Sequence, residues 1–389
     1  MKPSRSHLRS ILLAAAILAP GATPLAAEER PAAHGAVQAA FRIEAVLRDE
    51  MRLAGAHDVE VRNGYAYIAG KGGSLAIVDV RQPDAPRFVW SLHDPVGYED
   101  AETVLPLGKH LLVGTRDLML FDIAEPSLPQ RRVHLRNREQ IDFINGVVRV
   151  GNFILGANKA GFIVVTEWDG GDVLQFRGSR PTAHDGVVSP HDLDVTGEWL
   201  VVADGNGFGR NDKPGRVAVY RFRESDTSPP WPPERWTLEG KAEDRLLAGC
   251  NRVRTHGSLA IAACSISPAA GKADRRGSTQ LIDLTHPAAP RICGSIPFPD
   301  TRGANGLTVS GRVAFVCGGR TVQAIGFANR EKPEVLGSID LTKALPGGEA
   351  DLHDADYRDG HLYVTAQTSN ALIILKIEDP AILDAASRP

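Results

Sequence analysis

Short apolar runs separated by turn residues recur along most of the chain, and residues 57–92 show the pattern most clearly. In this stretch, HDVEV alternates apolar with polar side chains, Asn63-Gly64 is typical of a tight hairpin turn, and LAIVDV is almost continuously apolar. The stretch predicts four strands, at residues 57–61, 65–69, 75–80 and 87–92. Four short strands within about 40 residues are typical of one blade of a β-propeller.

The third strand of this unit is the easiest to follow along the chain. Equivalent apolar runs occur seven times, at residues 75–80, 118–123, 162–168, 217–222, 279–284, 322–327 and 371–377. The last unit lacks a fourth strand, and a spare apolar run, Phe41–Arg48, precedes the first unit. We expect this run to complete the last blade and close the ring, which leaves no open sheet edge. The pattern therefore predicts an all-β fold, a seven-bladed β-propeller of four-stranded blades.

The sequence LAIVDVRQPDAPRFVWSL, residues 75–92, resembles the LVIVD repeat of exported bacterial and archaeal β-propellers. The aspartate near the end of its third strand, Asp79, returns as Asp122 and Asp283, whereas three of the seven units replace it. The resemblance covers about residues 41–380 and implies the propeller fold. It implies no particular activity, because propellers host many unrelated functions.

The N-terminal residues have the three parts of a secretory signal peptide. Basic residues come first, a short apolar run follows at 11–19, and a small-residue region ends at Ala27. The apolar run is too short to span a bilayer, which needs about 20 residues. We therefore expect a periplasmic or secreted protein without a membrane span after cleavage. The expected boundaries are a signal peptide at 1–27, a flexible tail at 28–40, the propeller at 41–380 and a C-terminal tail at 381–389.

The overall charge argues against a nucleic acid as the partner. The formal net charge is −3 at pH 7, whereas a general nucleic-acid-binding protein needs a strongly basic face. We therefore expect no nucleic acid partner. The expected partner is a small molecule or another exported protein. We also expect the protein itself to be a monomer.

Polar residues recur where the predicted first strands open on the central channel. The first strand of a blade is innermost, so equivalent residues at its start stand around the channel mouth. Counting thirteen residues back from the end of each second strand gives His57, Ala101, Asn145, His191, Asn251, Asn305 and His353. The next residues are Asp58, Glu102, Gly146, Asp192, Arg252, Gly306 and Asp354. From these sets we predict a ligand site formed by His57, Glu102, Asn145, His191, Asn251, Asn305 and His353.

Cationic residues are expected on the same face, in the loops between second and third strands. They include Lys71, Arg116, Lys159, Arg210 and Arg320, and together they favour an anionic ligand. Ordinary solvated surface charge is the alternative interpretation. Two of these loops are long, at residues 204–215 and 265–277, and we expect them to form a rim or lid over the mouth.

The same residue types allow more than one function. Imidazole and carboxylate groups suit a transition metal, with His57, His191 and His353 as the metal ligands, and amide oxygens with carboxylates suit calcium. The first hypothesis is a protein that binds a small, anionic ligand or a metal at the mouth. One alternative is a metal-dependent hydrolase, lyase or oxidase, and a second is a protein-interaction scaffold without chemistry. The sequence does not decide whether the protein is an enzyme.

A purely structural role is open for three aspartates of the second set. Asp58, Asp192 and Asp354 occupy equivalent positions, and aspartates at such places often accept backbone N–H groups of connecting loops. In that case the histidines and asparagines would only line a wet channel.

The cysteines suggest a disulfide in an oxidising compartment. Cys250 and Cys264 lie near-opposite in the predicted hairpin of the fifth unit, so a bridge between them is sterically reasonable. Cys317 occupies almost the same place in the sixth unit, which makes Cys264–Cys317 a competing pair. The sequence does not choose between these pairings.

Overall fold

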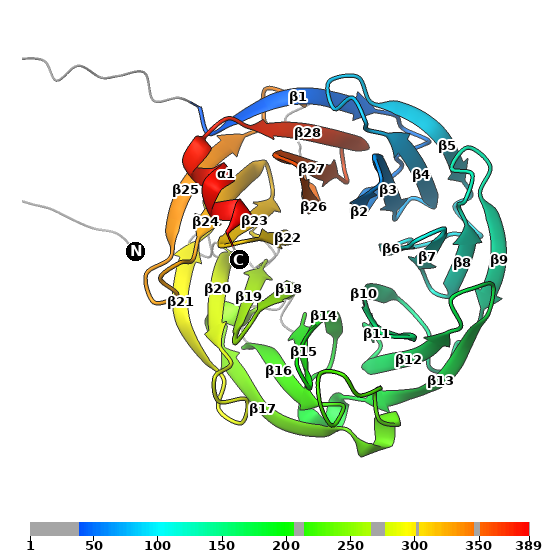
Figure 1. Ribbon diagram of the computed structural model, residues 1–389, viewed down its shortest axis with the longest axis vertical. Coiled ribbons are helices and arrows are strands. Elements are labelled where there is room, and N and C mark those ends of the chain that lie inside the picture. The colour runs from blue at the N-terminus through cyan, green and yellow to red at the C-terminus, as the bar shows by residue number, and fades with distance from the viewer. Residues whose placement is uncertain (1–38, 206–213, 266–276, 301–302, 346–350, 389) are drawn as a thin grey trace, which may run out of the picture. The chain divides into compact units, whose positions relative to one another are not determined.

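The fold is a ring of seven small antiparallel sheets. The computed structural model describes residues 39–205, 214–265, 277–300, 303–345 and 351–388. Within these residues, seven four-stranded sheets are arranged as blades around a central axis (Figure 1). The prediction of an all-β, seven-bladed β-propeller is therefore confirmed.

Each blade runs from an innermost to an outermost strand. The innermost strands are β2 (Ala56–Arg62), β6 (Thr103–Leu107), β10 (Ile144–Val150), β14 (Pro190–Thr196), β18 (Cys250–His256), β22 (Gly306–Ser310) and β26 (Leu352–Arg358). The second strands are β3 (Tyr65–Gly70), β7 (His110–Gly114), β11 (Phe153–Asn158), β15 (Trp199–Asp204), β19 (Leu259–Cys264), β23 (Val313–Gly318) and β27 (His361–Ala366). The third strands are β4 (Ser74–Asp79), β8 (Leu118–Asp122), β12 (Phe162–Trp168), β16 (Gly215–Arg221), β20 (Ser278–Asp283), β24 (Thr321–Gly326) and β28 (Ala371–Ile377). The outermost strands are β5 (Arg87–His93), β9 (Gln130–Leu135), β13 (Leu174–Pro181), β17 (Thr237–Asp244), β21 (Arg291–Pro297), β25 (Glu334–Asp340) and β1 (Phe41–Arg48).

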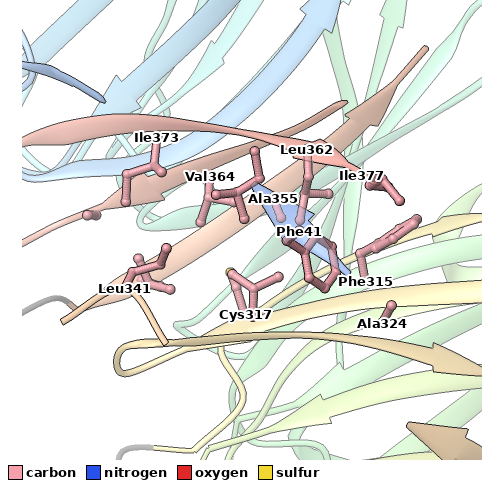
Figure 2. Packing of buried hydrophobic residues seen from close by; sticks show 14 of the residues in the cluster. Phe41, Phe315, Cys317, Ala324, Leu341, Ala355, Leu362, Val364, Ile373 and Ile377 are labelled. Atoms are coloured by element: carbon pink, nitrogen blue, oxygen red, sulfur yellow. The ribbon is translucent and has the colours of Figure 1, made fainter. Parts of the chain in front are cut away.

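The first strand of the chain closes the ring, as predicted. β1 pairs antiparallel with β28, with Phe41 opposite Ile377 and Arg48 opposite Ala371. Figure 2 shows Phe41 among the apolar side chains between the sixth and seventh blades, close to Phe315. Phe41 is 3% exposed, and burying a phenylalanine side chain contributes about 1.5 to 3 kcal/mol. The last blade thus gains its fourth strand and a share of its core from the opposite end of the propeller sequence.

The apolar pattern of each strand follows from its place in the blade. All six residues of β4 are buried, because neighbouring blades cover both faces of this third strand. The outermost strand β5 is exposed at both ends and partly buried between them. The core therefore consists of separate apolar clusters between neighbouring blades rather than one central core.

The recurrent aspartate of the repeat fixes the turn after the third strand. The Asp79 carboxylate accepts the backbone N–H of Arg81 at 3.1 Å and its guanidinium Nε–H at 2.9 Å. Asp122 and Asp283 each accept the backbone N–H two residues further along, both at 3.0 Å. This local bond gives the recurrent aspartate a structural role in the turn.

The C-terminal residues form a helix where the sequence suggested a tail. Helix α1 (Pro380–Ser387) begins after Asp379, whose carboxylate accepts the backbone N–H of Ala381 at 2.8 Å. Ile382 and Ala386 are buried on one face of the helix, and this apolar spacing holds it against the sixth and seventh blades. Among the described residues, single-turn 3-10 helices at Ala183–Asp185 and Arg245–Leu247 connect consecutive blades, and a third at Pro233–Arg235 lies between the last two strands of the fourth blade. In the part of the chain that the structure describes, no helix has the length and apolar character needed to cross a membrane.

Candidate ligand site at the channel mouth

Seven polar side chains occupy one equivalent position at the start of the innermost strands, one from each blade. In the second blade this residue is Glu102, not Ala101 as the sequence count indicated. The carboxylate of Asp58 accepts the backbone N–H of Val104 at 2.7 Å, two residues after Glu102. The corresponding bonds in other blades also reach the residue two positions after the mouth residue. The sequence count ran back from the end of each second strand. Because β7 has five residues, whereas the second strand of every other blade has six, the count in this blade began one residue too early.

These side chains form a nearly continuous belt of contacts around the axis. His57 Nδ1 lies 2.9 Å from the backbone oxygen of Glu102, and the amide Nδ2 of Asn145 donates to the backbone oxygen of His191 at 2.8 Å. Asn251 Nδ2 donates to Asn305 Oδ1 at 3.0 Å. The further contacts are Asn305 Nδ2 with the Leu352 backbone oxygen at 3.3 Å and the rings of His57 and His353, which are tilted by 32° with their centroids 3.6 Å apart. We call the seven residues His57, Glu102, Asn145, His191, Asn251, Asn305 and His353 the mouth belt.

Several polar atoms of the mouth belt remain without a partner among the described residues. They are His57 Nε2, Asn145 Oδ1, Asn251 Oδ1 and His353 Nδ1. His57 is 0% exposed, Asn145 1% and Asn251 4%. Leaving one buried polar atom unsatisfied costs about 1 to 3 kcal/mol, so these atoms need water or a ligand as a partner.

Two lysines share the single carboxylate of the mouth belt. Lys71 Nζ lies 3.4 Å from Glu102, and Lys159 forms a second ion pair with the other carboxylate oxygen. Glu102 is almost fully buried, whereas both lysines are partly exposed. Burial lowers the pKa of Lys159, and the neighbouring Glu102 carboxylate opposes this change. Asp100, which is partly buried, is a further acidic group near both lysines, and Glu102 is the carboxylate that pairs with them directly.

The three histidines experience this positive charge. Burial lowers the pKa of His57, His191 and His353 well below the usual range for histidine. The nearby charges of Lys71, Lys159 and Arg252 lower the pKa of all three further. The imidazoles are therefore neutral at pH 7, and the positive field around them favours an anion.

Arg252 crosses the channel axis next to the mouth belt. Its side chain is buried and extends from the fifth blade, with Nη2 lying 3.0 Å from Asp58 Oδ1 in the first blade. Its Nε lies 3.5 Å from Asp354 Oδ1, and its Nη1 donates to the backbone oxygen of Asn145 at 3.1 Å. The guanidinium thus joins four blades across the axis. The sequence analysis did not assign it to the site, although a single arginine aligned with three aspartates was a signal of charge pairing.

The three equivalent aspartates connect neighbouring blades. Asp192 accepts the backbone N–H of Val253 at 3.0 Å, and Asp354 accepts that of Val59 at 3.4 Å. Together with the bond from Val104 to Asp58, these contacts reach the innermost strand of the next blade rather than a connecting loop. Their role supports the structural interpretation of the aspartates, with strands as the bonded partners.

The structure does not bring the three histidines together as metal ligands. His57 and His353 are adjacent, but His191 lies in the fourth blade, where its Nδ1 is 3.2 Å from the backbone oxygen of Asn251. Among residues 39–388 outside the undescribed gaps, no group of three or more His, Cys, Asp or Glu side chains is arranged to hold a metal ion. A metal site formed by His57, His191 and His353 therefore has no geometric support.

The other predicted cations are engaged elsewhere or undescribed. Arg116 forms an ion pair with Asp142 at 2.8 Å and lies over the ring of Phe143. The backbone N–H of Arg320 donates to Asp300 at 2.9 Å. Arg210 and most of the long loops at 204–215 and 265–277 lie outside the described residues. Of the cations named from the sequence, Lys71 and Lys159 are the ones seen to contact the mouth belt.

The cysteines are free thiols in the structure. Cys250 and Cys264 are directly opposite in the register of β18 and β19, as the hairpin predicted, but they are not bridged. A hydrogen bond with Cys264 and burial raise the pKa of the Cys250 thiol. Cys317, the competing partner, is also free and packs in the apolar cluster near Phe315.

Comparison with known proteins supports the repeat and the fold. Residues 55–94 match the family model of the LVIVD repeat, which confirms the resemblance over that stretch. No curated protein sequence matches the chain. The WD40 domain of Pan2 from Neurospora crassa is similar in structure, with a TM-score of 0.61 and 11% identity over 87% of this chain and 96% of that domain. The WD40 propeller domain of Doa1 has a TM-score of 0.60 and 12% identity over 88% of this chain and 98% of that domain. The designed protein Ika8 has a TM-score of 0.53 and 10% identity over 84% of this chain and 98% of that protein. At these identities the likeness concerns the fold alone.

Proposed function

We propose that this chain, a seven-bladed β-propeller with an LVIVD repeat in its first blade, is a binding protein for a small anionic ligand at the mouth belt. The observation that carries the proposal is the set of buried polar atoms left without a protein partner, among them His57 Nε2, Asn145 Oδ1 and Asn251 Oδ1. If the mouth belt served only to join the blades, it would not need buried polar atoms that lack a protein partner.

Charge at the mouth supports an anion as the ligand. Lys71 and Lys159 both pair with Glu102 and lie near the partly buried Asp100, and an anionic ligand group would gain a charge interaction with both ammonium groups. Arg252 also lowers the pKa of the mouth-belt histidines, while Asp58 and Asp354 compensate part of its charge. We infer that a ligand enters from the face that carries the mouth belt.

The arrangement favours binding over metal-dependent catalysis. The sequence left open a hydrolase, lyase or oxidase, and each of these would need ligands that converge on one ion. The described histidines do not converge in this way. We therefore take the binding protein as the working function.

We also propose that the protein acts outside the cytoplasm as a monomer, with a small molecule as its partner. Support comes from the signal-peptide pattern of residues 1–27, which predicts a mature chain that begins at Glu28. Mass spectrometry of the protein purified from the periplasm or medium would test this start, and light scattering would test the monomer. A mature chain that retains residues 1–27 would contradict the proposed export.

The binding proposal can be tested by a thermal-shift screen with small anionic compounds. We expect at least one compound to raise the melting temperature of the wild type, and we expect Lys71→Gln to reduce this rise. In this variant Glu102 keeps its ion pair with Lys159, so the fold is preserved. Lys109→Gln is the matched control, because Lys109 is exposed in the turn between β6 and β7, far along the strands from the mouth. If no compound shifts the wild type, or if Lys71→Gln responds like Lys109→Gln, the proposed site is wrong.

A further inference from the structure

We propose that the ligand of the mouth belt is a small hydroxylated carboxylate, such as a hydroxy acid or a sugar acid. This inference rests on the proposed function and adds the chemical class of the ligand. It follows from the direction of the hydrogen bonds within the belt and from the charges beside it.

The hydrogen bond of His57 determines which ring nitrogen is free to accept. Its Nδ1 lies 2.9 Å from the backbone oxygen of Glu102, and a carbonyl oxygen can only accept, so Nδ1 carries the hydrogen. In the neutral imidazole the other nitrogen, Nε2, then has a lone pair and no hydrogen. This buried Nε2 is therefore an acceptor that needs a donor from the ligand.

Backbone oxygens fix the amide orientations in the same way. Asn145 must present its Nδ2 to the backbone oxygen of His191, which leaves Oδ1 free. Asn305 must present its Nδ2 to the backbone oxygen of Leu352, so its Oδ1 accepts from Asn251 Nδ2. Asn251 Oδ1 is therefore also left free. These three buried acceptors come from the first, third and fifth blades of the ring, and each requires an O–H or N–H donor.

The nearby charges decide which kind of donor fits. An ammonium group or a metal cation would satisfy acceptors, but Lys71, Lys159 and Arg252 would repel it. Hydroxyl groups donate without adding positive charge. A carboxylate on the same molecule would pair with Lys71 and Lys159, whose ion-pair partner is Glu102 and which also lie near the partly buried carboxyl of Asp100. Hydroxyls together with a carboxylate satisfy both requirements.

The direct test is isothermal titration calorimetry with matched probes of three to six carbons. Each set contains a hydroxylated acid, the same acid without hydroxyls, and the polyol without a carboxylate, for example gluconate, hexanoate and glucitol. We expect at least one hydroxylated acid to bind at least tenfold more tightly than both of its counterparts. If acids without hydroxyls bind equally well, this inference is overturned, while the proposed anion site stands. If no acid binds and the wider screen also finds no ligand, both proposals fail.

A variant of the acceptor provides a second readout. His57→Asn keeps an amide that can donate to the Glu102 backbone oxygen, as Asn145 does toward its neighbour, but it removes Nε2. We expect the preferred hydroxylated acid to bind at least fivefold more weakly to this variant, with little change in melting temperature. His286→Asn is the control, because His286 lies exposed in a turn between outer strands. Equal affinity in the two variants would exclude His57 as an acceptor for the ligand.

Discussion

Replacing Arg252 with methionine should destabilise the propeller strongly. Arg252 is 2% exposed, and its partners Asp58 and Asp354 are 5% and 4% exposed. Removing one member of a buried ion pair typically costs about 3 to 5 kcal/mol, because the remaining charge stays buried without compensation. Methionine fills much of the arginine volume, so the decrease in the free energy of unfolding comes from the missing charge rather than from a cavity. We expect Arg252→Met to lower the free energy of unfolding by about 3 to 5 kcal/mol at pH 8.

The destabilisation caused by Arg252→Met should be larger at pH 8 than at pH 5. Burial raises the pKa of Asp354 well above the usual carboxyl range, so this group takes up a proton readily once its cation is removed. A protonated carboxyl costs less to bury than a carboxylate, so the destabilisation should be smaller at pH 5 than at pH 8. For the same reason, adding Asp354→Asn to Arg252→Met should recover part of the lost stability at pH 8.

Urea denaturation followed by tryptophan fluorescence would measure these changes. Arg62→Met is a suitable control, because Arg62 also lies on an innermost strand but is half-exposed and 3.8 Å from Glu60. We expect this control to change the free energy of unfolding by less than about 1 kcal/mol. A loss for Arg252→Met that is no larger than the control, or that is independent of pH, would refute the assignment of Arg252 as the ionic link between blades.

Three further predictions concern the rest of the propeller. Burial, with the neighbouring carboxylates, raises the pKa of Glu60 to about 8, so the folded state holds a proton that the unfolded state releases. Stability should therefore fall as the pH rises from about 5 to 8, and urea midpoints should show a weaker fall for Glu60→Gln. Phe41→Ala should lower the free energy of unfolding by about 3 to 5 kcal/mol in the same assay, because the side chain fills the core where β1 closes the ring; a loss below about 1 kcal/mol would contradict that role. Thiol titration of the folded protein should leave Cys250, Cys264 and Cys317 unreacted, because they are buried, and all four cysteines should react after unfolding without reductant. Two unreactive cysteines in the unfolded protein would instead show a disulfide.

The sequence was sufficient for the architecture because each blade repeats its own local pattern. The turn pair Asn63-Gly64, the buried third strands and the spare run Phe41–Arg48 predicted the blades and their closure correctly. These features depend on residues close in sequence or on one obvious unpaired strand. The C-terminal helix was missed because it offers only eight residues of amphipathic pattern, about two turns, after the last strand, and its burial depends on contacts with Arg312 and its neighbours.

The mouth was predictable in outline and not in its contacts. Ring symmetry correctly placed His57 and its equivalents at one level, but the shorter β7 displaced the second blade by one residue and hid the equivalence of Glu102. The role of Arg252 depends on groups in three other blades, which no local pattern reveals. The separation of His191 from the other two histidines follows from blade order, which the seven repeated units did indicate.

The central claim, an anion site at the mouth belt, is tested most directly by a crystal structure of the protein with the tightest-binding acid from the calorimetric series. The account predicts ligand density within hydrogen-bond distance of His57 Nε2 and Asn145 Oδ1, with its carboxylate beside Lys71. Density at any other surface, with only water at these atoms, would contradict it.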